Sequence, residues 1–313
     1  MDEVLLERLR EEGLIGPGEP LVVMLSGGRD SVCILDLAVR LAGAPAVAAL
    51  HVNYGLRAES DEDERHSAEL CAALGVELTV ERPRRTPGAG NLQAWAREAR
   101  YAAAAALAEP AGAAILTGHT ADDQVETILY RLASSPSRRA LLGMKRRDGR
   151  LVRPLLGTTR AETTAYCEAR GLAWREDRSN EDEAFARNRV RRGLVPELER
   201  VHPAAAANVL RTAALLREEA ELLESLVDAE LAGSPGESPP VIPLARFAEL
   251  HPALRRLVLQ RLADLAAGRP VPGAARFASQ VAGLRRDGTA MLDLGGGIRA
   301  VVERGVLRAE RGS

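Results

Sequence analysis

A six-residue loop rich in glycine and hydroxyl groups is the first feature of this sequence that could carry chemistry. It reads Ser26-Gly27-Gly28-Arg29-Asp30-Ser31 and lies between an apolar run and a helical pattern. Glycines let backbone N–H groups approach phosphate oxygens, and a helix N-terminus favours anions. Asp30 would repel a phosphate unless it holds Mg²⁺ or a backbone N–H. The loop therefore predicts a phosphate-binding site, with an ordinary tight turn as the alternative.

Two carboxylates four residues apart form a second candidate site. Asp122 and Glu126 would project together from the first turns of a helix that follows the fourth apolar run. Two carboxylates at one crevice can hold Mg²⁺ or receive a cationic amine. We interpret Asp123 as a helix cap, because it lies three residues after Thr120. We expect His119, which lies beside these residues in the sequence, to act on the same ligand.

Two further motifs place polar groups where a ligand could bind. His51 and Asn53 end the second apolar run and alternate to one face of it, with Val52 on the other. The ends of parallel strands line the ligand crevice of such sheets, although a hydrogen-bonded structural histidine is an equal alternative for His51. Arg97 and Arg100 share a face of the following helix, where they could reach phosphates or lie in a solvated, salt-bridged surface.

The basic residues are almost all arginines and are unevenly spread. The 42 basic residues include one lysine, Lys145, which lies outside any glycine-rich loop and so excludes a Walker-A phosphate loop. The net charge is −2, yet residues 131–192 carry 16 basic and 8 acidic groups, whereas residues 1–130 carry 11 and 21. Arginine forks suit phosphate contacts. We expect the basic block to bind nucleic acid, with a solvated surface loop as the alternative.

Strands and helices that alternate must position these groups. The predicted strands are 21–25, 46–52, 76–80 and 113–117, and helical patterns follow at 30–41, 59–74, 91–108 and from Thr120. This order predicts an α/β fold with a doubly wound, mostly parallel sheet. Residues 1–200 would form this domain, and one long helix would cover 201–231. A Pro/Gly-rich linker at 232–240 would then lead into a smaller α+β domain, 232–313, of helices and a β-meander at 291–310.

Composition and pattern exclude several classes of protein. No apolar run reaches the roughly 18 residues of a membrane helix, and the charged N-terminus does not resemble a signal peptide. The three cysteines, Cys33, Cys71 and Cys167, are isolated in the sequence, which argues against structural zinc. We therefore expect a cytoplasmic protein without a membrane partner.

The motifs together resemble a known family. S-G-G-x-D-S at 26–31 is similar to the PP-loop of N-type ATP pyrophosphatases, and the ordered set of motifs resembles the tRNA(Ile)-lysidine synthetases from about residue 20 to 198. The stretches L-L-G-M (141–144), R-P-L-L (153–156) and R-N-R-x-R-x-x-L-x-P-x-L (187–198) carry the resemblance further. Two features depart from the family: residues 131–143 lack its R-G-x-G pattern, and the sequence shows one small C-terminal domain where many relatives carry two.

The resemblance implies a two-step ligation. ATP, with Mg²⁺, would adenylate O2 of the wobble cytidine in a minor isoleucine tRNA with a CAU anticodon, and pyrophosphate would leave. The ε-amine of free L-lysine would then attack C2, which gives lysidine and AMP. The cytidine would have to be unstacked, as single-stranded RNA loops allow. The C-terminal domain, 232–313, would bind tRNA. The oligomeric state stays open, with a homodimer as one alternative.

The resemblance also assigns roles to residues. The catalytic set would be Asp30, Arg100, His119, Asp122 and Glu126, with Asp122 and Glu126 for lysine and Asp30 and Asp122 for the metal. The ATP set would be Ser26, Gly27, Gly28, Arg29, Asp30, Ser31, His51, Asn53 and Gly118. The tRNA set would be Arg138, Arg139, Arg187, Arg189, Arg191 and Arg192.

Three other functions remain to be weighed. A PP-loop tRNA thiolase would need catalytic thiols, and the spacing of the three cysteines argues against it. A non-catalytic ATP-binding RNA module would bind ATP without releasing pyrophosphate, and the Asp122/Glu126 pair argues against that. An amidotransferase-type synthetase would need a glutaminase domain, often with cysteine after the initiator Met, where this sequence has Asp2.

Overall fold

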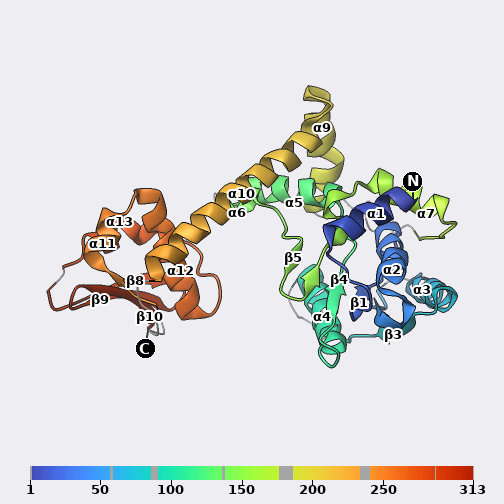
Figure 1. The fold of residues 1–313 in the computed structure, drawn as a ribbon, viewed down its shortest axis with the longest axis horizontal. Coiled ribbons are helices and arrows are strands. Elements are labelled where there is room, and N and C mark those ends of the chain that lie inside the picture. The colour runs from blue at the N-terminus through green and yellow to red at the C-terminus, as the bar shows by residue number, and fades with distance from the viewer. Residues whose placement is uncertain are drawn as a thin grey trace. The chain divides into compact units, whose positions relative to one another are not determined.

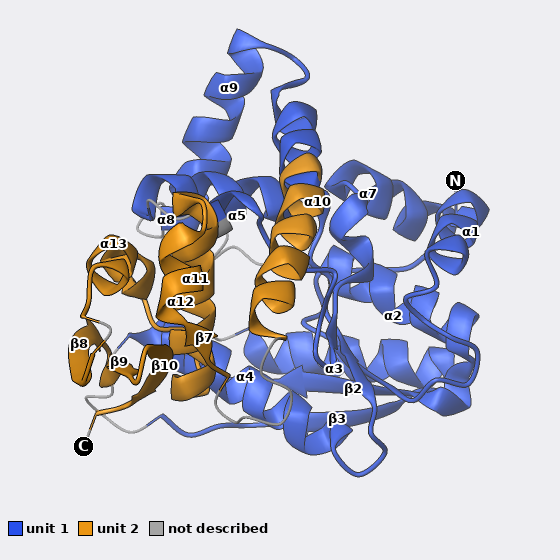
Figure 2. Ribbon diagram, turned by 60° about the vertical axis from the view of Figure 1, so that its left-hand side comes forward, with its two compact units in different colours: residues 1–214 blue, residues 215–313 orange. Residues whose placement is uncertain are grey.

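A computed structural model describes residues 2–56, 59–85, 91–135, 138–175, 186–232, 240–285 and 287–312. Backbone contacts divide the chain into two compact units, residues 1–214 and 215–313, which are coloured separately in Figure 2. Each unit has its own hydrophobic core and its own sheet. None of the helices described has the length and the apolar character needed to span a lipid bilayer.

The first unit is built on a six-stranded sheet in the order β3-β2-β1-β4-β6-β5. Every neighbouring pair is parallel except β5 with β6. The strands are β1 (Leu21–Met24), β2 (Val47–Val52), β3 (Glu77–Glu81), β4 (Ala114–Leu116), β5 (Arg147–Asp148) and β6 (Leu151–Val152). The predicted α/β class and mostly parallel sheet are confirmed, and β5 and β6 extend the sheet beyond the four predicted strands.

Helices cover both faces of this sheet, as Figure 1 shows. Alternate residues of β1 face opposite cores: Leu21 and Val23 pack with α1, α2 and α7, and Val22 and Met24 pack with α4. The principal helices are α1 (Asp2–Glu12), α2 (Arg29–Ala42), α3 (Ser60–Leu74), α4 (Leu92–Ala108), α5 (Ala121–Ser134) and α7 (Arg160–Ala169). Burial on both faces explains why the strands are continuous apolar runs in the sequence.

Side-chain caps fix where three of these helices begin. Asn91 accepts hydrogen bonds from two backbone N–H groups at the start of α4. Thr120 with Asp123 at α5, and Thr159 with Glu162 at α7, form reciprocal capping boxes. The helix starts that the sequence predicts at Asn91 and Thr120 are confirmed. Helix α1 is not among the predicted elements, and its residues Leu5, Leu6 and Leu9 are buried in the core.

Short helical segments lie between the larger elements of the first unit. They are η1 (Ala44–Ala46), α6 (Arg138–Leu141), η2 (Pro154–Gly157), α8 (Ala186–Arg189), η4 (Val190–Leu194) and α9 (Val195–Val201). The long helix α10 (Ala205–Leu231) begins four residues after its expected start at 201 and continues across the division between the units. Residues 233–239 of the expected linker lie outside the described residues.

The second unit contains a four-stranded antiparallel sheet in the order β7-β10-β9-β8. The expected meander is present, as β8 (Thr289–Gly295), β9 (Ile298–Glu303) and β10 (Val306–Arg311). Strand β7 (Ile242–Pro243) adds to its edge. The helices are α11 (Leu244–Glu249), α12 (Pro252–Ala267), η5 (Ala274–Phe277) and α13 (Ala278–Ala282), and they enclose a second apolar core around Phe247.

Candidate functional site

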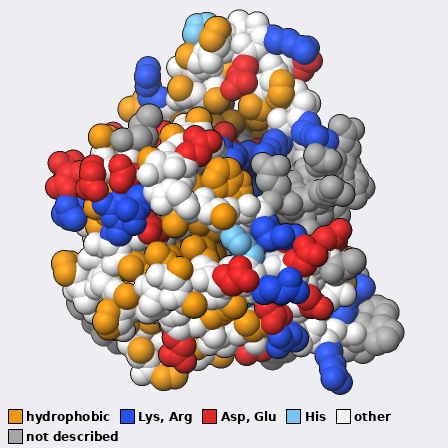
Figure 3. All heavy atoms as spheres, turned by 90° about the vertical axis from the view of Figure 1, so that its right-hand side faces the viewer, with side chains coloured by type: hydrophobic (Ala, Val, Ile, Leu, Met, Phe, Trp, Pro, Cys, Tyr) orange, Lys and Arg blue, Asp and Glu red, His pale blue; other side chains and the backbone are white. Residues whose placement is uncertain are grey.

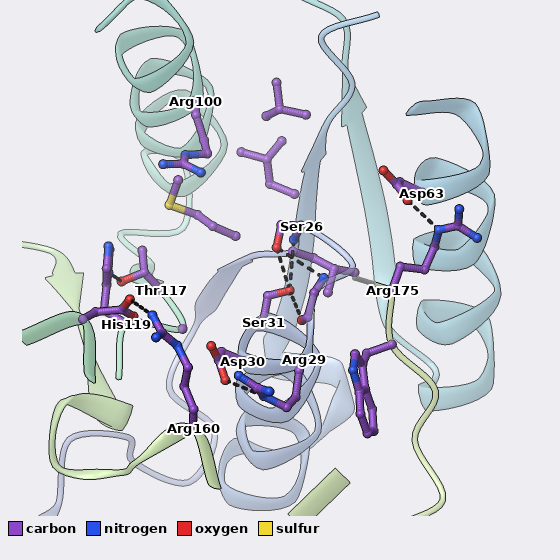
Figure 4. A pocket seen from close by; sticks show the side chains of 18 of the residues that line it. Ser26, Arg29, Asp30, Ser31, Asp63, Arg100, Thr117, His119, Arg160 and Arg175 are labelled. Carbon is purple, nitrogen blue, oxygen red and sulfur yellow. Dashed lines mark hydrogen bonds and ion pairs between the residues drawn. The ribbon is translucent and has the colours of Figure 1, made fainter. Parts of the chain in front are cut away.

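A cavity of about 570 Å³ lies at the carboxyl ends of β1, β2 and β4, within the first unit. This volume is in the range of small-molecule sites. In Figure 4, the Ser26–Ser31 loop lies at its centre, with Arg100, His119 and Arg160 on one side and Arg175 on the other. The cavity occupies the position where open parallel sheets bind ligands.

The phosphate-type loop is held in shape by its two serines. The Ser31 hydroxyl donates to Gly28 O at 2.7 Å and accepts from Ser26 N at 3.1 Å, and the two serine hydroxyls are 3.0 Å apart. Gly27 has φ of +80°, which only glycine adopts without strain. No side chain caps the start of α2. The first N–H groups of α2 therefore remain available to an anion in the cavity.

Gly118 allows the end of β4 to lie against this loop. A β-carbon on Gly118 would be 2.6 Å from the carbonyl oxygen of Asp30 and 3.0 Å from Ser31 N. Both contacts are with backbone, which cannot swing aside. Glycine at position 118 is thus required for the close approach of the two segments that form the floor of the cavity.

Asp30 lines the cavity, and the hydrogen bonds to its carboxylate are made to one oxygen, Oδ1. Its Oδ1 accepts from Thr163 Oγ1 at 2.6 Å and from Arg29 Nε at 3.1 Å, and 22% of its side chain is exposed. Among the described residues there is no group of three or more acidic, histidine or cysteine side chains placed to cage a metal. Mg²⁺ commonly uses one or two carboxylates together with ligand phosphates, and Asp30 fits that arrangement.

The acidic residues of α5 are paired with arginines. Glu126 accepts from Arg160 Nη1 and Arg187 Nε, both at 2.9 Å. Asp123 caps α5 through Oδ2, and its Oδ1 accepts from Arg160 at 2.7 Å and Arg187 at 3.1 Å. Burial raises the pKa of Asp123, but Arg187, Arg160 and the backbone hydrogen bond from Thr120 together outweigh it and hold the pKa below its usual value. Asp122 lies outside the cavity lining and accepts from the backbone N–H of Arg160 at 2.8 Å.

His119 lines the cavity beside this cluster. Its Nδ1 is 2.7 Å from the hydroxyl of Thr117, and burial lowers the pKa of its imidazole to about 4. Nearby Arg187, Arg153 and Arg100 lower the pKa further, whereas Asp123 raises it. The ring is consequently neutral at physiological pH. Arg100 also lines the cavity, and its Nε atom is buried without a hydrogen-bond partner among the described residues.

His51 and Asn53 lie on the far face of β2 from the cavity. His51 Nδ1 is 3.0 Å from Leu25 O and 3.3 Å from the Ser67 hydroxyl, and burial lowers its pKa. Asn53 donates to the carboxylates of Asp61 and Glu64 on α3. The alternate positions, Leu50 and Val52, line the cavity instead, together with Tyr54. His51 and Asn53, which are predicted to bind ATP, therefore make hydrogen bonds that connect β2 to the end of β1 and to α3.

The predicted RNA-binding arginines lie in several places, and Arg187 belongs to the cluster of Asp123 and Glu126. Arg191 and Arg192 line the cavity, and burial lowers the pKa of Arg191. Arg189 lines a shallower hollow with Tyr130 and Leu194. Arg138 begins α6, and the side chain of Arg139 lies outside the described set, as do Arg57 and residues 177–180. On the face shown in Figure 3, basic and acidic side chains lie next to one another and do not form separate fields.

Several lining residues escaped the sequence-based predictions. Arg160, Trp174 and Arg175 come from α7 and the segment after it, and Arg175 forms an ion pair with Asp63 on α3. Trp174 and Arg175 lie in no motif with a recognisable spacing, and the capping box that contains Arg160 signals a helix start and not a ligand site. Thr117 could have been found, because it ends a predicted strand next to His119.

The atypical segment after α5 is anchored by one side-chain amide. Gln124 accepts from Met144 N at 2.7 Å and donates to Met144 O at 2.9 Å. Arg131 adds a hydrogen bond to Gly143 O at 2.7 Å. Gly143 has φ of +66°, and a β-carbon there would be 2.6 Å from Gln124. The L-L-G-M stretch is thus fixed on α5 although the usual glycine-rich pattern is missing.

Comparison with known proteins identifies relatives of the whole site. A family model described as a PP-loop domain matches residues 6–198. The tRNA(Ile)-lysidine synthase of Thermus thermophilus is 42% identical over 261 residues, which cover 82% of this chain and 51% of that protein. The enzyme of the same name from Symbiobacterium thermophilum is 37% identical and aligns with 98% of this chain and 69% of its own length. The chain therefore spans about half the length of some curated relatives.

A solved structure supports the fold alone. The U34-tRNA thiolase NcsA from Methanococcus maripaludis, solved with its [4Fe-4S] cluster, superposes with a TM-score of 0.57 over 69% of this chain and 78% of that one. Its sequence identity is 16%, so the likeness concerns the architecture of the sheet and helices and carries no statement about chemistry.

Proposed function

Because the chain belongs to the PP-loop domain family and, within it, to the tRNA(Ile)-lysidine synthases, we propose that it ligates free L-lysine to C2 of the wobble cytidine of a minor isoleucine tRNA. ATP would be consumed, and AMP and pyrophosphate would be released. The observation that carries the proposal is one cavity in which the PP-loop, His119 and the acidic start of α5 meet.

ATP would bind with its phosphates on the loop Ser26–Ser31. Backbone N–H groups at the start of α2 and the guanidinium of Arg100 would stabilise charge on the α-phosphate as cytidine O2 attacks it and pyrophosphate leaves. Mg²⁺, held by Asp30 and the phosphates, would supply further neutralising charge. Asp122, which already binds the backbone at the start of α7, remains the second expected metal ligand.

Lysine would enter beside the acidic start of α5. The sequence predicts Asp122 and Glu126 as the carboxylate partners of its cationic groups, but neither of them lines the cavity. Asp123 does line it, next to His119, and shares Arg160 and Arg187 with Glu126, so Asp123 and Glu126 are the proposed pair for lysine. The neutral ring of His119 can accept a hydrogen bond from an amine without repelling it. When the ε-amine, deprotonated to the solvent, attacks C2 of the adenylated cytidine, the C–N bond forms, the C2–O2 bond breaks with AMP as the leaving group, and nitrogen releases a further proton.

One incubation tests the proposal directly. Radiolabelled lysine is mixed with the protein, ATP and bulk tRNA, and label in acid-precipitable RNA is counted, with ATP, tRNA or protein omitted in turn. Label should enter the RNA only in the complete mixture, with AMP and pyrophosphate in equal amounts. Pyrophosphate released without lysine transfer would contradict the proposal.

A matched pair of variants connects the activity to α5. We expect Asp122→Ala to lose most lysine incorporation, because the carboxylate holds the start of α7 and with it Arg160. Asp148→Ala, which removes an exposed carboxylate on β5, should keep full activity. An Asp122→Ala protein with wild-type incorporation would remove Asp122 from the proposal.

A tRNA thiolase is the weaker alternative. Cys33, Cys71 and Cys167 are buried, and none of them lines the cavity, so no thiol of the chain is placed for sulfur transfer there. The homodimer stays a prediction, which the mass measured by light scattering checks.

A further inference from the structure

The two carboxylates proposed for lysine, Asp123 and Glu126, are already paired with arginines of the protein itself. Both oxygens of Glu126 accept from guanidinium groups, one from Arg160 and the other from Arg187. Asp123 uses one oxygen for the cap of α5 and the other for the same two arginines. Only 4% of the Glu126 side chain is exposed. Arg191 Nε also lies 3.9 Å from Glu126, so the negative charge of the two carboxylates is already balanced by guanidinium groups and attracts a further cation only weakly.

The two arginines are held very differently. Arg160 begins α7, its backbone N–H binds Asp122, and only 17% of its side chain is exposed. Arg187 lies on the four-residue helix α8, and 45% of its side chain is exposed. It also starts the arginine-rich stretch that continues through Arg192. Arg187 is thus the guanidinium that can leave the cluster at the lower cost.

An RNA phosphate is the natural competitor for this guanidinium. Arginine binds phosphate through the same two-pronged geometry that it uses here with carboxylates. We propose that Arg187 couples RNA binding to lysine binding: it occupies the ammonium subsite of Asp123 and Glu126 until RNA withdraws it. This inference rests on the proposed function and deepens it, because Arg187 becomes a positioning residue that delays lysine until the cytidine is in place.

The coupling must be reciprocal, which makes it measurable without catalysis. Lysine binding is measured by equilibrium dialysis with labelled lysine and no ATP, with and without an unmodified isoleucine tRNA transcript. In the wild type, RNA should tighten lysine binding by about tenfold or more. In Arg187→Gln, lysine should bind about tenfold tighter than to the wild type without RNA, and RNA should add little.

Two controls separate this role from a general loss of charge or fold. Arg200→Gln removes an exposed arginine of α9 that is paired with Glu197, and it should behave as the wild type. Arg187→Lys keeps the cation but loses the fork, so its coupling should lie between those of the wild type and Arg187→Gln. Circular dichroism confirms that each variant is folded, and the wild-type comparison does not depend on any variant.

The outcomes distinguish this inference from the proposed function. In one outcome, the protein incorporates lysine into tRNA while its affinity for lysine stays the same with and without RNA and in Arg187→Gln. That result overturns the coupling and leaves the proposed function intact. No lysine binding and no incorporation in any form, with or without RNA, overturns both. Unchanged lysine affinity in Arg187→Gln without RNA is by itself sufficient to reject the role of Arg187.

Discussion

At the scale of single residues, Gly118 has the clearest steric role. Gly118→Ala would place a β-carbon 2.6 Å from the backbone of Asp30, so β4 or the loop must move. We expect a loss of about 1–3 kcal/mol in the free energy of unfolding, as for other overpacked sites, together with a raised KM for ATP. Urea unfolding and pyrophosphate release at varied ATP measure the two effects.

Gly193 provides the control for this substitution. Its β-carbon would meet nothing within 4 Å, and its φ is not positive. Gly193→Ala should therefore leave the unfolding free energy within about 0.5 kcal/mol of the wild type or raise it slightly. Equal unfolding free energies and equal KM values for the two variants would show that a β-carbon at position 118 fits without displacing the backbone of Asp30.

His119 predicts how stability depends on pH. Its pKa is about 4 in the folded protein, against about 6.5 for an unperturbed histidine, because the ring is buried near Arg100, Arg153 and Arg187 with only Asp123 opposing. The unfolded chain binds the proton first as the pH falls. The stabilisation is therefore complete above pH 6.5 and is lost between pH 6.5 and 4, by roughly 3 kcal/mol.

A variant isolates the contribution of this histidine. His119→Gln keeps a polar side chain that does not titrate, so its unfolding free energy should fall less steeply than that of the wild type between pH 6.5 and 4. Chemical unfolding at several pH values in this window gives the difference in slope. Parallel curves for the two proteins would mean that the pKa of His119 is not depressed.

At the scale of elements, Gln124 joins α5 to the segment that precedes β5. Its amide satisfies both backbone groups of Met144, as a neighbouring strand would. Gln124→Leu would leave these groups without partners, which costs about 1–3 kcal/mol. We expect a matching drop in unfolding free energy and faster hydrogen exchange at the Met144 amide. Gln93→Leu, at an exposed position of α4, should change neither.

The elements themselves could largely be predicted from the sequence, because their signals are local. The capping residues Thr120 and Thr159 and the apolar runs of the central strands act within a few residues of where they stand. Strands β5 and β6 could not be predicted, since each has two residues and depends on pairing with the sheet. The start of α1 gives no cap signal, and its helix is stabilised by packing.

The site could be predicted less completely, because its partners come from distant parts of the chain. A period of two shows that His51 and Asn53 share a face of β2, but helices cover both faces, so the pattern cannot tell which one meets the cavity. The spacing from Thr120 predicts the cap at Asp123. Its pairing with Arg160 and Arg187 follows only from the fold.

At the scale of the whole molecule, the charge is divided along the chain. Residues 1–130 are acidic and residues 131–192 are basic, with 16 basic against 8 acidic groups, although the total is −2. Many of these arginines already pair with carboxylates, as Arg160 and Arg175 do. The number of arginines that bind phosphate must therefore be smaller than the number in the block. The salt dependence of the tRNA affinity measures that number.

The affinity for tRNA should fall linearly with salt on logarithmic axes, with a slope set by the number of phosphates that the protein neutralises. Arg192→Gln should lower the magnitude of this slope by about one if Arg192 binds a phosphate. Arg10→Gln on α1, where Arg10 is exposed and paired with Glu7, should leave the slope unchanged. Filter binding between low and moderate salt measures both. An affinity that does not change with salt would contradict a phosphate-binding role for the basic block, because its guanidinium groups would then be satisfied entirely within the protein.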